Sequence, residues 1–439
     1  MTTTSYRRNI PLFIAFRVLF NARWYYPVMT VLFLDLGLTV EQFALLNVAW
    51  AAAIVGLEVP SGALADRFGR KKMVVAAAAL MVIEMLVFAF APRSNPSLLF
   101  ILFLINRILS GAAEASASGA DEALAYDSLV AEGRANYWPR VLELLMRWQS
   151  AAFFAAMLIG AAVYDEKFLQ SAIHLIGLPW KITRDLAIHL PIYLTLGNAL
   201  FALLVAINLR EPTVASAAAE ETTPSSAWIA TFATGKWIMA TPLVLAVILT
   251  GLCFDSITRL FLTFASIYYR MISVPTAYFG VIGSGFALFG FFVPALARRM
   301  LPRRSMRANF AIIGVLIFLG LFGIEFVWPI YGLFFLIPIG IAMSFNQFFV
   351  SHYLNELITD SGQRATALSF RGLAYNLAYG GAGLLFAGLT RYLREYPNQH
   401  GNVTEDSVFI ASLSWLPWYF VVTTALLIVT IVRRRRPSN

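Results

Sequence analysis

The stretch that decides the fold is Gly62-Ala-Leu-Ala-Asp66-Arg67-Phe-Gly69-Arg70-Lys71-Lys72, a short charged segment between two long apolar ones, 40–63 and 73–92. A charged turn of this kind cannot lie exposed in hydrocarbon, so it is predicted to lie at the membrane–water boundary. Short loops on the cytoplasmic side accumulate Lys and Arg, and four of the last six residues are cations. The direction of every other segment follows from this one.

The rest of the chain is much more apolar than a soluble protein. Of its 439 residues, 59% are hydrophobic and 13% are charged, and the mean hydropathy is +0.72. A soluble domain has about 45–50% apolar and about 25% charged residues. A membrane-spanning helix needs about 20 apolar residues, so the chain has room for about a dozen. The net charge of +9 lies mostly in loops, which indicates membrane topology rather than a nucleic-acid partner.

Twelve apolar segments are predicted to cross the membrane, and the loop charges fix their direction. With both termini on the cytoplasmic side, that side carries 20 Lys and Arg against 7 on the other. This asymmetry predicts a multi-pass protein of the cell membrane, in bacteria the inner membrane, with both termini cytoplasmic. The segments are 11–36, 40–63, 73–92, 97–127, 139–163, 187–208, 242–266, 276–297, 308–327, 329–352, 365–390 and 408–432.

An internal repeat divides the chain in two. Ala63-Leu-Ala-Asp66-Arg67 reappears 232 residues later as Ala295-Leu-Ala-Arg298-Arg299, although the second copy has lost the acid. Side-by-side repeats are common in transporters. We therefore expect an all-α protein with a six-helix bundle over 1–209, a cytoplasmic linker over 210–240 and a second six-helix bundle over 241–439. The small, polar and acidic core of the linker is expected to be flexible, and the apolar residues 227–240 are expected to form an amphipathic helix on the membrane surface.

The opening stretch resembles the signature loop of the major facilitator superfamily, which lies between spans 2 and 3. The matching pattern is Gly62-x-Leu64-x-Asp66-Arg67-x-Gly69-Arg70-Lys71, and the twelve spans, the linker and the second copy extend the resemblance over the whole chain. In that superfamily the loop latches the two halves together on the cytoplasmic side. The fold that the resemblance implies is two pseudo-symmetric six-helix bundles.

The resemblance implies a role for each residue of the loop. Asp66 would face the N-terminal end of span 11, and Arg70 would pair with Asp127 at the end of span 4. Gly62 and Gly69 would allow close packing and a sharp turn. Arg67 belongs to the same latch. The alternative is that the loop only sets the topology through its positive charge.

Charged side chains inside spans are costly and normally face the protein interior or a cavity. In the superfamily, spans 1, 4, 7 and 10 line a central cavity. On span 1, Arg17, Asn21 and Tyr25 are spaced four apart and are predicted to share one helix face. On span 4, Arg107 and Glu114 are seven apart and also share a face, and Glu114 is the candidate proton-coupling carboxyl, with a structural ion pair as the alternative.

Other charged pairs are predicted to serve as gates or structural supports. Asp255 and Arg259 are four residues apart on span 7, so their opposite charges can neutralise each other. Arg147 and Arg371 occupy matching positions of the repeat in spans 5 and 11. We interpret them as a paired cytoplasmic gate, with anion binding as the second interpretation.

Polar and aromatic residues on spans 10 and 11 complete the predicted substrate and proton pathway. Aromatic rings with a few amides suit an organic solute, although each amide could equally make an ordinary interhelical hydrogen bond. These residues are Asn346, Gln347, Tyr375, Asn376 and Tyr379.

These observations predict a secondary active transporter that acts as a monomer. We expect it to move a small organic solute, anionic or amphipathic, by alternating access with proton-coupled export. A hydrophobic-drug antiporter, a lipid transporter and a non-transporting membrane sensor are the alternatives. Neither enzyme activity nor a cofactor is expected, and one cysteine with four scattered histidines gives no metal site.

Overall fold

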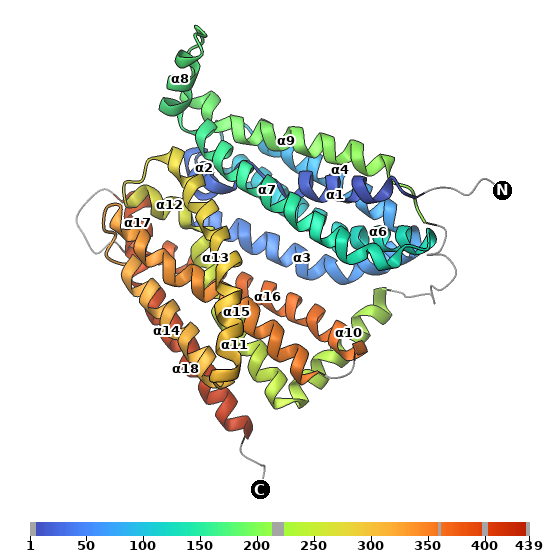
Figure 1. The fold of residues 1–439 in the computed structure, drawn as a ribbon. Helices are drawn as coiled ribbons and strands as arrows, with labels where there is room; N and C mark the ends of the chain where they lie inside the picture. The colour runs from blue at the N-terminus through green and yellow to red at the C-terminus, as the bar shows by residue number, and fades with distance from the viewer. Residues whose placement is uncertain (1–5, 213–223, 359–360, 397–402, 436–439) are drawn as a thin grey trace, which may run out of the picture.

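The computed structural model describes residues 6–212, 224–358, 361–396 and 403–435, and within these ranges it is helical with no strand. The chain folds into two helical bundles, the first drawn blue to green and the second yellow-green to red (Figure 1). The first bundle contains α1 (Asn9–Asn21), α2 (Met29–Asp35), α3 (Val40–Phe68), α4 (Arg70–Phe90), α5 (Pro96–Ala117), α6 (Ala120–Ala131), α7 (Trp138–Tyr164), α8 (Glu166–Leu175) and α9 (Arg184–Asn208).

The second bundle repeats this pattern after the short helix α10 (Pro224–Ala240). It contains α11 (Pro242–Thr263), α12 (Ala265–Met271), α13 (Phe279–Met300), α14 (Met306–Ile324), α15 (Leu336–Leu357), α16 (Ser361–Glu395), α17 (Glu405–Leu413) and α18 (Trp415–Arg435). Short 3-10 turns η1 (Tyr26–Val28), η2 (Ala135–Tyr137), η4 (Thr276–Tyr278), η5 (Leu301–Arg303) and η6 (Tyr331–Phe335) precede or follow several of them.

The number of membrane-crossing segments agrees with the predicted fold. Ten helical segments of the described chain are long and apolar enough to cross a membrane by length and composition. The other two of the twelve predicted segments are the first span, which is interrupted into α1, η1 and α2, and α16, which is rich in glycine and polar residues. We call the end that carries residues 67–72 and 298–304 the basic end, and the other end the opposite end.

The first span is not the continuous helix that its sequence predicts. Helix α1 ends at Asn21, and Pro27 begins the next turn, η1. Proline has no backbone N–H and cannot continue the hydrogen-bond ladder of the preceding turn. The seventh span is also interrupted, at Phe264 between α11 and α12, although no proline is present there. Both pseudo-equivalent spans are therefore broken into two helices.

Part of the predicted flexible linker is also helical. Helix α10 occupies the second half of the range 210–240 and packs across α3 and α16. A Cβ atom added to Gly235 would lie 2.9 Å from the ring of Phe370, so the helix is seated directly on α16. The helix expected over 227–240 is therefore present and begins at Pro224, and its neighbours on two sides order it by packing rather than by its own propensity.

The two bundles are joined at the opposite end by polar contacts. Thr30 donates from its backbone N–H to Ser266 Oγ (3.0 Å) and from its hydroxyl to the carbonyl of Thr263 (2.6 Å), which brings the interruptions of spans 1 and 7 together. Arg270 reaches Asp35 (3.3 Å), and Arg394 reaches Glu41 (3.0 Å). In the described ranges, the hydrogen bonds and ion pairs between the bundles lie at this end.

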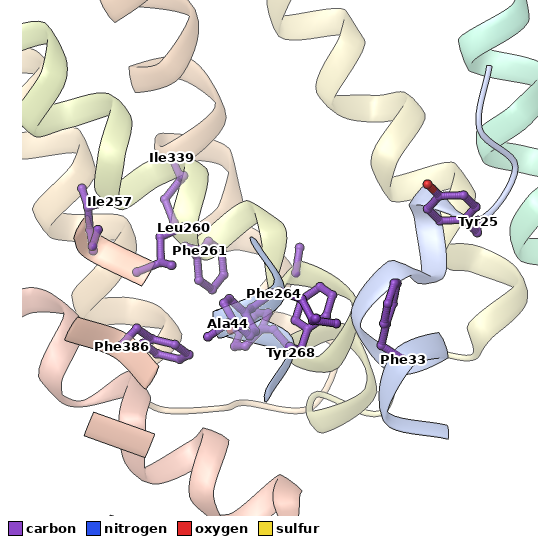
Figure 2. Close-up of a cluster of buried hydrophobic side chains, with 14 of the residues drawn as sticks. Tyr25, Phe33, Ala44, Ile257, Leu260, Phe261, Phe264, Tyr268, Ile339 and Phe386 are labelled. Atoms are coloured by element: carbon purple, nitrogen blue, oxygen red, sulfur yellow. The ribbon is translucent and has the colours of Figure 1, made fainter. Parts of the chain in front are cut away.

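Aromatic packing closes the same end. Phe33, Ala44, Phe264, Tyr268 and Phe386 gather from both bundles in one buried cluster (Figure 2). The rings of Phe33 and Phe264 contact Phe43 with centroids 5.1 Å and 5.3 Å away, and the ring of Phe386 lies 4.7 Å from that of Phe264. Burial of such large side chains stabilises the contact by about 1.5–3 kcal/mol each. This aromatic seal blocks passage through the opposite end.

Candidate functional site

A cavity of about 610 Å³ lies between the two bundles. It extends from Ser266 and Tyr269, beside the aromatic seal, toward the basic end at Asn47, Trp50 and Tyr379. Side chains from both bundles line it, and they include three arginines, one carboxylate and several aromatic rings. The lining residues used below are Arg23, Tyr26, Asn47, Trp50, Arg107, Glu114, Arg259, Gln347 and Tyr379. Its volume is that of a pocket for a small organic molecule.

Four of these side chains form a stack that crosses from one bundle to the other. The guanidinium of Arg107 lies 5.5 Å from the ring centroid of Trp50, and that of Arg259 lies 5.1 Å from the ring of Tyr379. The rings of Trp50 and Tyr379 meet edge to face with centroids 6.4 Å apart. We call Arg107, Trp50, Tyr379 and Arg259 the cation–π stack. It places two positive charges on either side of an aromatic pair.

The two arginines of the stack differ in how their charges are balanced. Arg259 donates to Asp255 Oδ2 (2.6 Å) and to Asn376 Oδ1 (2.9 Å), so a carboxylate neutralises it. Arg107 donates to the neutral amide oxygen of Asn47 (2.9 Å), and its Nε is buried with no hydrogen-bond partner. Arg107 is therefore the arginine of the stack whose charge has no acidic partner in the described chain.

Close helix packing holds Arg107 against Trp50. Helices α3 and α5 approach each other at Gly111, where an added Cβ atom would lie 2.7 Å from Ala53 Cβ and 2.8 Å from the carbonyl oxygen of Trp50. A contact this short is possible only for a residue without a side chain. One turn along α5 from this contact, the Arg107 side chain is 94% buried.

A second arginine, Arg23, borders the cavity at the interruption of span 1. It forms an ion pair with Glu84 of α4 and donates to the hydroxyl of Tyr25 (3.1 Å). The side chains of Arg23 and Glu84 are 3% and 1% exposed, and Glu84 Oε2 has no hydrogen-bond partner. A buried pair of this kind is strongly destabilised if one partner is lost, because the other charge is left uncompensated.

Glu114 is the carboxylate of the cavity wall, and no arginine pairs with it in the described chain. Glu84, Asp121 and Asp255 are each held by an arginine: Arg23, Arg17 and Arg259 respectively. Glu114 lies half-buried in the cavity wall, and in the described chain it forms no hydrogen bond or ion pair. The arrangement leaves one carboxyl group in the cavity wall without an arginine partner in the described chain.

The structure does not bring the three predicted span 1 residues into the cavity. Arg17 is held by Asp121 and Glu122 at the junction of α5 and α6, and Asn21 donates to the carbonyl of Arg17 (2.8 Å). The shared helix face does not extend to Tyr25, because α1 ends at Asn21. Tyr25 is buried against Phe88, and its neighbour Tyr26 lines the cavity instead.

Of the residues predicted on spans 10 and 11, some line the cavity and the others make contacts between helices. Gln347 and Tyr379 line the cavity, and Asn376 supports Arg259 from behind. Asn346 donates to the carbonyl of Gly251 (3.0 Å), which is the interhelical alternative considered from the sequence. Tyr375 packs on the same glycine, and its hydroxyl is buried without a partner.

The structure does not pair the two predicted gate arginines with each other. Arg147 is 71% exposed and bonded to Glu143 on its own helix (2.5 Å). Arg371 lies 5.9 Å from the ring of Tyr375. In this conformation the two arginines have separate partners on separate helices. The gate therefore stays a prediction about another conformation.

The signature loop lies at the basic end and is fixed by an acid that the sequence did not single out. Gly69 has a φ of +100°, a conformation that side chains disfavour, and it ends α3 and begins α4. Glu211 accepts hydrogen bonds from the backbone N–H groups of Arg70 (3.0 Å) and Lys71 (2.7 Å) at the start of α4. A carboxylate at a helix N-terminus is favoured by the helix dipole.

Other predicted contacts of the loop are partly present. Arg70 forms an ion pair with Asp127. Arg67 is exposed and stacks on Phe68 (5.4 Å), and nothing lies within 4 Å of a Cβ added to Gly62, so no close packing requires that glycine. The side chain of Asp66 and those at the start of α16 lie outside the described residues. A latch contact between them remains a prediction.

Several residues of the site carry no signal in the sequence that marks them as functional. Trp50, Asn47 and Tyr26 have no distinguishing pattern among the many apolar and aromatic residues of their spans. Arg23 and Glu84 were visible as intramembrane charges, but nothing in their spacing showed that they pair with each other. Pairing across spans depends on how the helices are arranged.

Comparisons with known proteins identify this architecture. A family model described as Major Facilitator Superfamily matches residues 12–383. The solved nucleoside transporter NupG is 16% identical with a TM-score of 0.68, and the match covers 97% of this chain and 99% of that one.

Two other solved transporters have the same fold. A bacterial homolog of the human lysosomal transporter Spinster, in an inward-facing and unoccupied conformation, is 14% identical over 99% and 100% of the two chains (TM-score 0.71). A D-xylose–proton symporter is 14% identical over 97% of each (TM-score 0.66). Such low identity shows a shared fold alone. A search of the curated proteins finds no match.

Proposed function

The chain belongs to the major facilitator superfamily, and from this premise we propose that it is a secondary active transporter for small organic anions. The cation–π stack carries the proposal. Arginine binds a carboxylate or phosphate with two parallel hydrogen bonds, and Arg107 lines the cavity with a guanidinium that no carboxylate neutralises in the described chain. The solute we propose carries one such anionic group and an apolar or aromatic body that lies against Trp50 and Tyr379.

The conformation supports alternating access. The aromatic seal and the Thr30–Ser266 contact close the opposite end, while Asn47, Trp50 and Tyr379 of the cavity lie further along their helices toward the basic end. If the basic end is cytoplasmic, as the loop charges predict, this conformation faces inward. We propose that the solute is loaded from the cytoplasm in this state and exported. Rocking of the first bundle (1–209) against the second (241–439), with 210–240 as the connection, would then expose the site to the outside.

Glu114 is the proposed proton-coupling residue. It is the cavity-facing acid that no arginine neutralises in the described chain, so its charge is sensitive to what occupies the cavity. Because a carboxylate and an anion in one cavity repel each other, binding of an anion at Arg107 would change the protonation of Glu114 and so couple solute movement to proton movement. Glu114→Gln removes the exchangeable proton while keeping the size of the side chain.

Reconstitution in proteoliposomes tests the function. Purified protein is given an imposed pH gradient of either sign and a panel of organic anions, neutral sugars, nucleosides and lipophilic cations. We expect uptake of an organic anion into vesicles that is driven in one orientation of the gradient. If no solute moves, or only neutral or cationic solutes move, the proposal is wrong.

Two variants assign the roles of the site residues. Arg107→Gln is expected to raise the KM for the anion about 10- to 100-fold, because a hydrogen bond to a charged group contributes about 1.5–3 kcal/mol. Arg299→Gln, an exposed arginine at the basic end, is the matched control and should leave KM unchanged. In Glu114→Gln, exchange of the anion across the membrane should continue in the absence of a pH gradient. An imposed pH gradient should no longer drive transport in this variant. A Glu114→Gln variant with intact pH-driven transport would remove Glu114 from this role.

A further inference from the structure

A second hollow lies on the outer surface of the C-terminal bundle, away from the central cavity. It has a volume of about 820 Å³ and lies between α11, α14 and α18, which pack against one another (Figure 1). Its walls are apolar, with Phe310 and Phe318 from α14 and Phe420 from α18 among them. None of these residues belongs to the central site. We call this hollow the outer groove.

The outer groove exists because α14 carries a glycine where a side chain would fill it. A Cβ added to Gly314 would make ordinary van der Waals contact with Phe254 Cζ (3.6 Å) and Phe420 Cζ (3.9 Å), so the glycine leaves room for an apolar group beside the two rings. Phe254 and Phe420 are each 4% exposed, which shows that the groove reaches the interior of the bundle. This depth distinguishes it from the ordinary lipid-facing surface of a helix.

The length and direction of the groove match one leaflet of a bilayer. Its α14 wall extends from Met306 to Leu319, fourteen residues of the helix, or about 20 Å at about 1.5 Å per residue. Half of the hydrocarbon core of a bilayer is about 15 Å thick. The groove begins at the basic end, where α14 starts, so it would accept an acyl chain that enters from the leaflet on that side.

The mouth of the groove is positively charged. Arg307 lines it from the first turn of α14, and in the described chain Arg307 has no ion-pair or hydrogen-bond partner. Arg433 follows directly after the lining residue Val432 at the other side of the mouth. The N-terminal end of α14 adds the positive end of a helix dipole. An exposed, unpaired arginine at headgroup depth is complementary to a phosphate.

From the groove and its charged mouth we infer a binding site for one anionic glycerophospholipid of the leaflet at the basic end. One acyl chain fills the space over Gly314, and the phosphate lies against Arg307. Zwitterionic lipids present the same acyl chain but a headgroup without net charge. The site therefore discriminates by headgroup at the mouth and by shape in the groove.

Native mass spectrometry of the full chain tests this inference, with dioleoyl phosphatidylglycerol and dioleoyl phosphatidylcholine as the two probes. We expect the wild type to retain phosphatidylglycerol about fivefold more strongly, as one basic side chain at an anionic headgroup predicts. Arg307→Gln should bring the two lipids to parity, and Gly314→Leu should remove the bound molecule of both. Thermal unfolding in the same lipids checks that the variants fold.

Matched controls separate the groove from general effects. Arg299→Gln removes another exposed arginine at the basic end, and Gly388→Leu enlarges another helix glycine with open space around it. Both should behave as wild type. Equal retention of the two lipids by the wild type, or an unchanged preference in Arg307→Gln, would overturn the inference. Solute transport by the central site is a separate measurement, and its result does not decide this one.

Discussion

Asp35 offers the most direct test of how the opposite end is closed. Its carboxylate accepts from Tyr164 (2.6 Å) and Arg184 (2.5 Å) in its own bundle and from Arg270 (3.3 Å) in the other. The first two bonds connect parts of one bundle and can persist when the bundles separate. Only the bond to Arg270 favours the closed opposite end over the open one.

The magnitude follows from the exposure of this pair. Arg270 is 34% exposed and Asp35 is 25% exposed, so the bond is weaker than a fully buried charged hydrogen bond and stronger than a surface ion pair. We estimate about 1 kcal/mol, between the two limits. Asp35→Asn should therefore raise the population with an open opposite end about fivefold, since about 1.4 kcal/mol corresponds to tenfold.

A second contact between the bundles makes the test quantitative. Glu41 and Arg394 are similarly exposed, 22% and 26%, and lie 3.0 Å apart. Glu41→Gln should have an effect of about the same size. Perturbations at distant sites usually add, so the double variant should shift the population about 25-fold.

Distances between spin labels report this population. Labels at Ser94→Cys and Tyr331→Cys, both exposed at the opposite end in different bundles, are introduced in a Cys253→Ser background. The share of long distances should rise in Asp35→Asn and rise further in the double variant. Asp185→Asn, which breaks an exposed bond to Arg93 within the first bundle, is the control. A folded Asp35→Asn variant with the distances of the wild type would refute the reasoning.

Three more substitutions test the supports of the site. Arg23→Gln should destabilise the protein by about 3–5 kcal/mol because it leaves Glu84 as an unpaired buried charge, and adding Glu84→Gln should recover part of this loss; a double-mutant cycle in thermal unfolding that shows no coupling would contradict the pair. Gly69→Ala should cost about 1 kcal/mol or more through its positive φ, while Gly62→Ala should cost less than half of that in the same assay. Gly111→Ala should force α5 away from α3, lowering stability by about 1–3 kcal/mol and weakening anion binding; unchanged binding would show that the packing does not position Arg107.

The sequence determined the class of the protein through short-range properties. The length of each apolar segment predicts a membrane span, and the charges of the loops between segments predict its direction. Both properties can be read from one segment at a time, because each segment must be long and apolar enough to cross the bilayer. The loop around Gly69 could be recognised because its turn and its cations are neighbours in the chain. The pair Asp255–Arg259 was predicted for the same reason, since its partners lie one helical turn apart.

Only the tertiary structure decided which residues form the site. The helix of span 1 was expected to continue through Tyr25, but the interruption before Pro27 turns Tyr26 and Arg23 toward the cavity instead. Trp50 meets Tyr379 across 329 positions of sequence, and Arg23 meets Glu84 across two spans. A bilayer constrains each helix by its composition, but the partner of a buried charge is set by helix packing, to which residues distant in the sequence contribute together.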